Sequence, residues 1–345
     1  MITLYINGIK IEAEEDMTIY QAAQKAGIYI PVLCYHPDLS TFGACRVCMV
    51  EANGRVVTAC RAIVEEGMIV QTDTEDVEMI RKFNVELILA SHNQDCQTCS
   101  RNNDCKLQEV SSFIGVEPDG MQKIRRNQLD TPIDDSNPFF FRDHSKCILC
   151  GICIRACDEI NGVTALDFAF RGYNTLVSVP GNKPLRESSC ESCGECMERC
   201  PTGALARSGQ QKPEREIKSV CPYCGVGCNI KLGTRGRKVV QVRGDHDNPV
   251  NEGELCVKGR FGFEFINHPE RLSKPLVKKN GKLEEASWDE ALDKVSQKLK
   301  EICDQNGADS IGTLSSARCS NEENYLFQKL FRSLGTNNID HCARL

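Results

Sequence analysis

Regularly spaced cysteines constrain this chain more than any other feature. It has 22 cysteines among 345 residues, and all but three of them fall into five groups with short, repeated spacings. Runs of the form C-x-x-C-x-x-C crowd thiols that could not all form disulfides of sound geometry. This pattern favours metal clusters over a disulfide framework. The sequence therefore predicts an iron–sulfur protein that carries electrons.

The first group has the spacing C-x10-C-x2-C-x11-C and comprises Cys34, Cys45, Cys48 and Cys60. One long loop supplies three thiolates and a following strand supplies the fourth, which suits a [2Fe-2S] cluster with backbone N–H groups aimed at its sulfurs. Zinc is the alternative, although structural zinc sites usually pair two short C-x2-4-C knuckles.

The second group mixes one imidazole with three thiolates, in the order His92, Cys96, Cys99 and Cys105. Such a set fits either zinc or a [4Fe-4S] cluster. Its position between two groups of iron–sulfur type favours the cluster. A neutral imidazole in place of a thiolate makes the cluster less negative, which should raise its reduction potential.

Two further groups repeat the spacing C-x2-C-x2-C-x3-C: Cys147, Cys150, Cys153 and Cys157, then Cys190, Cys193, Cys196 and Cys200. This is the internal repeat of a two-cluster ferredoxin, in which the fourth cysteine of each run ligates the cluster of the other run. We therefore expect Cys200 to join the first three cysteines of the first run. Cys157 should join the first three of the second run.

The last group comprises Cys221, Cys224, Cys228 and Cys256, spaced C-x2-C-x3-C-x27-C. Four thiolates again fit a [4Fe-4S] cluster, with zinc as the alternative. Cys303, Cys319 and Cys342 lie outside every group. Cys303 stands beside the apolar stripe of a predicted helix and is expected to be a packing residue.

Local patterns predict a multidomain α+β chain. A hairpin over residues 2–13 turns at Asn7-Gly8, and a helix from Thr18 to Ala26 ends at Gly27. A capping box at Thr72 and Glu75 is expected to begin a helix that presents Val77, Ile80, Phe83 and Leu87 on one face and delivers His92. The polar stretches 112–138 and 208–219 resemble connectors.

The C-terminal region shows an α-β-α pattern. Ser287 and Glu290 are expected to cap a helix that ends at Gly307. A strand over residues 310–314 and a helix over residues 321–334, closed by Gly335, should follow.

Charge and hydropathy exclude some functions. Charged residues number 42 basic and 48 acidic without a long block of one sign, which argues against nucleic acid as a partner. No stretch approaches the roughly 18 apolar residues of a membrane span, and the first residues lack the pattern of a signal peptide. We therefore expect a cytoplasmic protein.

Three motifs around the fifth cysteine group resemble the N-terminal cluster domain of molybdenum or tungsten bis-pterin enzymes, specifically formate dehydrogenase catalytic subunits. They are CPYCGVGCN, NPVNEGELCVKGRFGFEFINHPERLSKPL and, after them, ASWDEAL. The first three cluster modules resemble the iron–sulfur extension shared by the large complex I iron–sulfur subunit, iron-only hydrogenases and longer formate dehydrogenases. The resemblance implies a β-grasp [2Fe-2S] ferredoxin (1–76), a [4Fe-4S] module with one histidine and three cysteine ligands (77–117), a two-cluster [4Fe-4S] ferredoxin (137–208), a Mo/W bis-MGD-type [4Fe-4S] domain (214–270) and an α/β start of the molybdopterin domain (271–345).

The resemblance also implies a function and its cofactors. Formate would be oxidised to CO2, in a reaction that can reverse, at a Mo or W bis-MGD centre, and one [2Fe-2S] and four [4Fe-4S] clusters would pass the electrons on. Lys258, in CVKGR, would lie between the last cluster and one pterin. Expected partners are a flavin- or NAD(P)-binding iron–sulfur subunit, a ferredoxin or hydrogenase subunits, because the chain shows no convincing dinucleotide-binding glycine motif.

In that family, the motif resembling IDHCARL is followed by a selenocysteine or cysteine that binds the metal and then by a histidine. We expect a UGA codon after Leu345, with a fragment of a longer chain as the alternative. On either reading these residues alone are not expected to oxidise formate, and His341 and Cys342 precede the ligand position. The competing functions are a non-catalytic electron-transfer subunit like that of complex I and a subunit of a hydrogenase complex.

Overall fold

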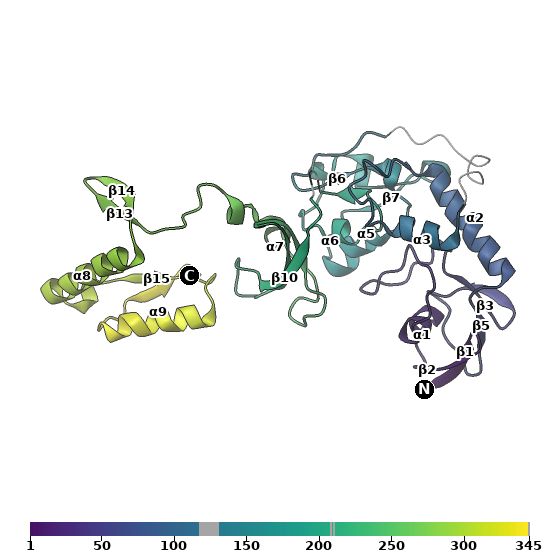
Figure 1. The fold of residues 1–345 in the computed structure, drawn as a ribbon, viewed down its shortest axis with the longest axis horizontal. Helices are drawn as coiled ribbons and strands as arrows, with labels where there is room; N and C mark the ends of the chain where they lie inside the picture. The colour runs from purple at the N-terminus through teal and green to yellow at the C-terminus, as the bar shows by residue number, and fades with distance from the viewer. Residues whose placement is uncertain (117–130, 208, 210, 344–345) are drawn as a thin grey trace. The chain divides into compact units, whose positions relative to one another are not determined.

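The computed structural model describes residues 1–116, 131–207, 209 and 211–343. The chain divides into two compact units, Met1–Gln210 and Gln211–Leu345. Figure 1 labels their helices and strands.

The first unit begins with a five-stranded mixed sheet of order β2-β1-β5-β3-β4. β1 and β5 pair in parallel, while the other neighbours are antiparallel. Asn7 and Gly8 have φ values of 50° and 78°, so the predicted hairpin turn is confirmed. The strands are β1 (Ile2–Ile6), β2 (Ile9–Ala13), β3 (Met49–Ala52), β4 (Arg55–Thr58) and β5 (Ile69–Gln71).

Helix α1 (Ile19–Lys25) packs on this sheet and confirms the helix predicted from Thr18. Thr18 and Gln21 form a capping box, and Gly27 follows the helix with a φ of 71°. Fully buried apolar side chains from the sheet and the helix, such as Leu4, make the core. This core also contains Cys48 and Cys60, so two predicted ligands belong to the packing of the domain itself.

Helix α2 (Glu75–Ser91) has His92 as its C-cap and so delivers it as predicted, but the predicted capping box is wrong and the predicted apolar face is right only at Val77. Thr72 exchanges two hydrogen bonds with Asn7 across the domain, so its side chain does not cap the helix. The N-cap is Thr74. The helix buries Val77, Arg81 and Val85, whereas Phe83 is exposed, because the Arg81 guanidinium turns inward to donate to a backbone carbonyl.

The rest of the first unit consists of short elements around the cysteine loops. β6 and β9 pair antiparallel and bring residues 141–142 beside residues 205–206. The elements are α3 (Lys106–Ile114), β6 (Phe141–Arg142), η1 (His144–Lys146), α5 (Ile152–Arg155), η2 (Ala156–Ile160), β7 (Asp167–Ala169), η3 (Gly172–Asn174), β8 (Leu176–Ser178), η4 (Pro180–Asn182), η5 (Leu185–Glu187), α6 (Glu195–Glu198) and β9 (Leu205–Ala206). Most of the predicted connector 112–138 lies outside the described residues.

The second unit begins with the antiparallel sheet β10-β11-β12. Its strands are β10 (Arg215–Val220), β11 (Asn229–Arg235) and β12 (Lys238–Gly244). The expectation of a connector over residues 208–219 is therefore wrong for its second half. β10 is a mostly exposed, charged edge strand, so it lacks the alternation of apolar residues that would have predicted it.

The C-terminal part of this unit has the predicted α-β-α order, with a second short strand at its end. Ser287 caps α8 through the Glu290 amide, and Gly307 follows the helix, both as predicted. The elements are α7 (Val257–Phe261), η6 (Glu264–Asn267), β13 (Leu276–Lys279), β14 (Lys282–Glu285), α8 (Trp288–Asn306), η7 (Ala308–Ser310), β15 (Thr313–Ser315), α9 (Asn321–Ser333) and β16 (Ile339–His341).

Helices of membrane-spanning length and apolarity are absent from the described ranges.

Candidate iron–sulfur sites

The four thiols of the first group converge at one buried place. The Cys45 and Cys60 thiols donate to Cys34 and lower its pKa to about 2, and Cys60 also hydrogen-bonds Cys48 and lowers the pKa of that thiol. The same contacts raise the pKa of Cys45 and Cys60, because a thiol held by a neighbouring thiolate keeps its proton. All four sulfurs could become thiolates at this separation only if a positive charge, such as that of bound iron, lay between them.

Backbone N–H groups also point at these sulfurs. The amides of Ala44 and Cys45 donate to Cys34, and the amide of Val47 donates to Cys45. Cys34, Cys48 and Cys60 are each only 1% exposed. Converging buried thiols that accept backbone N–H bonds fit the [2Fe-2S] cluster predicted from the spacing, with these four cysteines as its holders.

The second group lies beside the ferredoxin-like loops of the same unit. The Cys105 thiol interacts with Cys99 and lies 3.7 Å from the carbonyl oxygen of Pro201. A Cβ at Gly203 would stand 2.6 Å from the Cys99 sulfur, so the glycine leaves the room that this thiol occupies. Cys96 is half-buried and its carbonyl accepts the Cys99 amide.

His92 is held as a neutral base. Burial lowers its pKa to about 4, with a smaller contribution from Lys146. Its Nδ1 atom is buried and has no hydrogen-bond partner among the described residues. A neutral imidazole whose buried Nδ1 atom has no protein partner fits a metal ligand, so the residues present are compatible with the predicted cluster of one imidazole and three thiolates.

The two ferredoxin runs share one local conformation. Leu149 and Gly151 of the first run have positive φ, as do Ser192 and Gly194 at the matching positions of the second. In each run the amide two residues after the first cysteine donates to that cysteine's sulfur, at 3.5 Å from Leu149 and 3.4 Å from Ser192. The sequence repeat is therefore also a repeat of backbone conformation.

The fourth cysteine of each run lies with the other run. Cys157 lines one cavity together with Cys190, Cys193 and Cys196. Cys200 acts electrostatically on Cys147 and Cys150. Burial and the neighbouring thiols together raise the pKa of Cys153 and Cys196 well above that of a free thiol. The structure thus brings together the crossed sets expected from the spacing, and the assignment as ligands stays a prediction.

The first group and the first ferredoxin run are direct neighbours. Cys34 and Cys150 belong to one hydrophobic cluster with Leu39, Ile152 and Ala156. A separate cluster joins Cys45 and Cys105 through buried residues of α2 and α3. The [2Fe-2S] site therefore adjoins both the ferredoxin-like site and the module that contains His92.

The fifth group lies in the second unit. Cys221 and Cys228 are linked by a backbone hydrogen bond of 2.8 Å, and both thiols interact with Cys224 and Cys256. Cys221 is buried, but Cys224 and Cys256 are exposed. Tyr223 donates its hydroxyl to the carbonyl of Gly262 and joins the loop to α7.

Lys258 is exposed on α7, two positions after Cys256. The Cys224–Gly225 loop approaches the α/β part of the same unit, because a Cβ at Gly225 would stand 3.6 Å from the carbonyl oxygen of Ala317. The Ala317 amide in turn donates to the Cys342 sulfur at 3.4 Å and lowers the pKa of this thiol.

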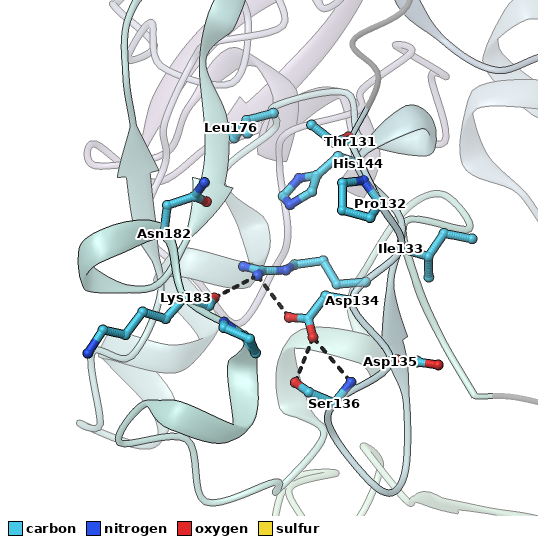
Figure 2. A pocket seen from close by; sticks show the side chains of 12 residues that line it. Thr131, Pro132, Ile133, Asp134, Asp135, Ser136, His144, Leu176, Asn182 and Lys183 are labelled. Atoms are coloured by element: carbon cyan, nitrogen blue, oxygen red, sulfur yellow. Dashed lines mark hydrogen bonds and ion pairs between the residues drawn. The ribbon is translucent and has the colours of Figure 1, made fainter.

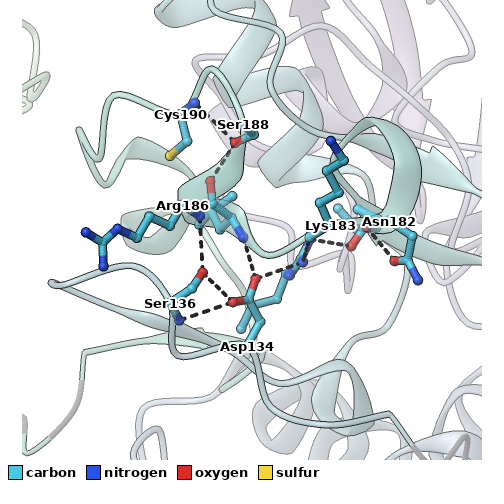
Figure 3. A network of polar contacts seen from close by, with 11 residues as sticks. Asp134, Ser136, Asn182, Lys183, Arg186, Ser188 and Cys190 are labelled. Atoms are coloured by element: carbon cyan, nitrogen blue, oxygen red, sulfur yellow. Dashed lines mark hydrogen bonds and ion pairs between the residues drawn. The ribbon is translucent and has the colours of Figure 1, made fainter.

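A polar network that the spacing did not predict positions the Cys190 loop (Figure 3). The Asp134 carboxylate accepts from Ser136, from the Leu185 amide and from Arg142. The Ser188 hydroxyl, which accepts the Cys190 amide, donates to the carbonyl of Leu185. Burial raises the pKa of Asp134, but these hydrogen bonds outweigh it and leave the pKa lowered.

A pocket of about 310 Å³ borders this network (Figure 2). Arg142 lines it and donates to the Asp134 carboxylate at 2.9 Å, and His144 and Lys183 also line it. The residues that line it include none of the predicted ligands.

Sequence reasoning also missed Asn161, which donates to the Cys193 sulfur at 2.6 Å. The sequence signal for this contact is that Asn161 lies four residues after Cys157. That position points to Cys193 once Cys157 is placed with the cysteines of the second run. Within the described ranges, no three His, Cys, Asp or Glu side chains form a group that could hold a single metal ion.

Family models match successive parts of the chain. They are a 2Fe-2S iron–sulfur cluster binding domain (1–75), the NADH-ubiquinone oxidoreductase-G iron–sulfur binding region (81–118), a 4Fe-4S dicluster domain (146–204), the molybdopterin oxidoreductase Fe4S4 domain (214–268) and molybdopterin oxidoreductase (271–345). The chain combines 2Fe-2S, 4Fe-4S and molybdopterin oxidoreductase domains. This order of domains agrees with the order of the cysteine groups.

Related proteins span the same combination. All of this chain aligns with 40% of the "NADPH-Fe(3+) oxidoreductase subunit alpha" of Geobacter sulfurreducens at 38% identity. The "Putative formate dehydrogenase YrhE" of Bacillus subtilis is 31% identical over 99% of this chain and 40% of its own length. A chain in the crystal structure of an NAD+-reducing [NiFe]-hydrogenase has a TM-score of 0.55 and 30% identity over 60% of this chain and 88% of that one. The chain thus spans about 40% of the length of these two curated relatives.

Proposed function

We propose that this chain is the electron-transferring part of a formate dehydrogenase, which converts formate to CO2 and a proton and passes two electrons to a partner subunit. The observation that carries the proposal lies in the second unit. There the Cys224–Gly225 loop of the Fe4S4 domain approaches Ala317 of the molybdopterin oxidoreductase match. A cluster domain placed against a pterin-type domain favours the transfer of substrate electrons.

The cofactors follow from the residues that gather. We infer one [2Fe-2S] and four [4Fe-4S] clusters, and a Mo or W bis-MGD centre in the complete protein. When bound, iron–sulfur clusters take up and release single electrons, and a pterin-bound metal supplies the two-electron chemistry at the substrate. This chain's own residues bury the sulfurs, donate backbone N–H bonds to them and fix the spacing of the sites.

The order of the sites in the first unit supports a branched route. Sequence order alone predicts a relay from the ferredoxin pair through the His92 group to the [2Fe-2S] site. The packing of Cys34 against Cys150 supports a direct route as well. We infer that the Cys147–Cys150–Cys153–Cys200 site can deliver electrons to the [2Fe-2S] site without passing through His92.

Lys258 is inferred from the resemblance to assist electrons between the pterin and the Cys221 group. Lys258 is exposed close to Cys256 in the sequence, which leaves its ammonium available to a neighbouring group. A Lys258→Met variant of the complete protein should reduce formate-dependent dye reduction and keep the wild-type iron content. Unchanged activity would remove Lys258 from the proposal.

The partner is inferred to be a flavin- or NAD(P)-binding iron–sulfur subunit, a ferredoxin or a hydrogenase subunit. The similarity to a chain of an NAD+-reducing [NiFe]-hydrogenase supports this class of partner.

The test uses the complete gene product. Its translation includes the selenocysteine or cysteine expected after Leu345. Formate should reduce a viologen dye, and metal analysis should find about one Mo or W per chain. A complete product that binds neither metal would overturn the enzyme proposal. The selenocysteine stays a prediction, and a codon other than UGA after Leu345 would contradict it.

A second function is favoured by one observation. Residues 81–118 match the NADH-ubiquinone oxidoreductase-G iron–sulfur binding region, which supports an electron-transfer subunit without substrate chemistry of its own. That function predicts intact iron–sulfur signals together with no Mo, no W and no response to formate.

A further inference from the structure

Arg155 is buried between two predicted cluster sites. It ends α5, between Cys153 and Cys157 in the sequence, and only 8% of the residue is exposed. Its Nη2 atom donates to the carbonyl oxygen of Cys34 at 2.7 Å, and Nη1 donates to the carbonyl of Ser40. One guanidinium thus joins the ferredoxin-like helix to the loop that begins the [2Fe-2S] site.

No carboxylate in the described part of the chain neutralises this guanidinium. Arg155 forms no ion pair there, and its Nε atom is buried without a hydrogen-bond partner. Glu159, one turn further on, accepts from Ser40 instead. The guanidinium carbon lies 5.5 Å from the centre of the Phe42 ring. A buried charge without a partner is costly unless another group supplies the opposite charge.

Arg81 repeats this arrangement from another side. It is 5% exposed, lacks an ion pair among the described residues, and donates to the carbonyl oxygen of Met49 at 2.9 and 2.6 Å. Met49 directly follows Cys48. The other two buried arginines in the described ranges of this unit, Arg142 and Arg199, are paired with Asp134 and with Glu195 and Asp38.

The two buried arginines without an ion pair in the described first unit therefore both face backbone carbonyls of the [2Fe-2S] loops. A four-thiolate [2Fe-2S] cluster is anionic and becomes more negative when it accepts an electron. A fixed cation that is close by and shielded from water stabilises the reduced form more than the oxidised form.

We propose that Arg155 and Arg81 set the reduction potential of the [2Fe-2S] site by supplying its buried positive charge. The proposal rests on the cluster assignment of the proposed function. A raised potential would make the [2Fe-2S] site a favoured acceptor of electrons from the site that contains Cys150. Arg155 and Arg81 are positioning and charge-supplying residues rather than ligands.

The test is a redox titration of the full chain with reconstituted clusters, followed by EPR at a temperature where [4Fe-4S] signals are broadened. Arg155→Gln and Arg81→Gln should each lower the ratio of reduced to oxidised [2Fe-2S] about tenfold at a fixed potential, a shift of about 59 mV for one electron. Arg155→Lys keeps the charge and should titrate close to the wild type.

Arg142→Gln is the matched control, because Arg142 is also buried and also donates to a backbone carbonyl, but it is paired with a carboxylate. Its [2Fe-2S] titration should match the wild type. If Arg155→Gln does not retain the cluster, Arg81→Gln decides. Wild-type potentials in both glutamine variants, or loss of the cluster from both, would overturn the proposal. A wild-type chain without any [2Fe-2S] signal would instead overturn the cluster assignment.

Discussion

The [2Fe-2S] site and the Cys221 site hold their thiols in opposite surroundings. At the first, three of the four cysteines are 1% exposed and two belong to the core of the sheet and α1. At the second, Cys224 and Cys256 are exposed. The difference shows that the packing of a whole domain holds the predicted ligands of the first site. At the second site, Cys221 packs in a hydrophobic cluster, while Cys224 and Cys256 lie at the surface.

Replacing one predicted ligand at each site should give the largest difference between them. Cys60→Ser should abolish the [2Fe-2S] EPR signal and lower the thermal stability of the first unit, because Cys60 is part of its core. Cys256→Ser should remove one [4Fe-4S] signal and leave the melting of the first unit unchanged. EPR and calorimetry of the two variants check both statements. Equal destabilisation of the first unit by both substitutions would contradict the difference proposed between the two sites.

Exposure should also govern how easily iron leaves. The Cys221 site, with two exposed thiols, should lose iron to a chelator about tenfold faster than the [2Fe-2S] site, because solvent reaches its sulfurs directly. The decay of the separate EPR signals during exposure to a chelator measures the two rates. Faster loss at the [2Fe-2S] site would contradict the role given to burial.

A buried leucine of the first unit and an exposed leucine of the second give a third contrast, in stability. Leu4→Ala in the sheet core should lower the free energy of unfolding of the first unit by about 2–5 kcal/mol. Leu292→Ala on α8 should change stability by less than about 0.5 kcal/mol, since Leu292 is 57% exposed. Chemical denaturation followed by circular dichroism measures both, and a large effect at Leu292 would show that its face is covered.

The network around Asp134 should make a smaller, pH-dependent contribution. Asp134→Asn should destabilise the first unit by about 1–2 kcal/mol at neutral pH, because it weakens charge-assisted hydrogen bonds to Ser136, Leu185 and Arg142. The pKa of Asp134 is lowered in the folded chain, so its stabilising effect is present above the usual value of 3.8. The effect is lost as the pH falls through the lowered value.

Measuring the free energy of unfolding of the wild type and of Asp134→Asn between pH 7 and pH 3 tests this pH dependence. The difference in unfolding free energy between wild type and Asp134→Asn should stay constant above about pH 5 and narrow as the pH falls below the usual value of 3.8. A gap that widens on acidification would contradict the assignment.

Much of the molecule could be predicted from the sequence because its signals are local. The turn at Asn7-Gly8, the caps at Thr18 and Ser287 and the cysteine runs each depend on residues a few positions apart. The helix face of α2 could not be predicted, because it is decided by an Arg81 contact to Met49, 32 positions away. The contact of Arg155 could not be predicted for the same reason, since its partner Cys34 is 121 positions away.

The most direct test of the central claim is the iron and acid-labile sulfide content of the full chain after anaerobic reconstitution. Five clusters predict about 18 irons and about 18 sulfides per chain. A zinc ion in place of the His92 cluster would give about 14 of each and one zinc. A chain that binds zinc at every group and contains no labile sulfide would contradict the account.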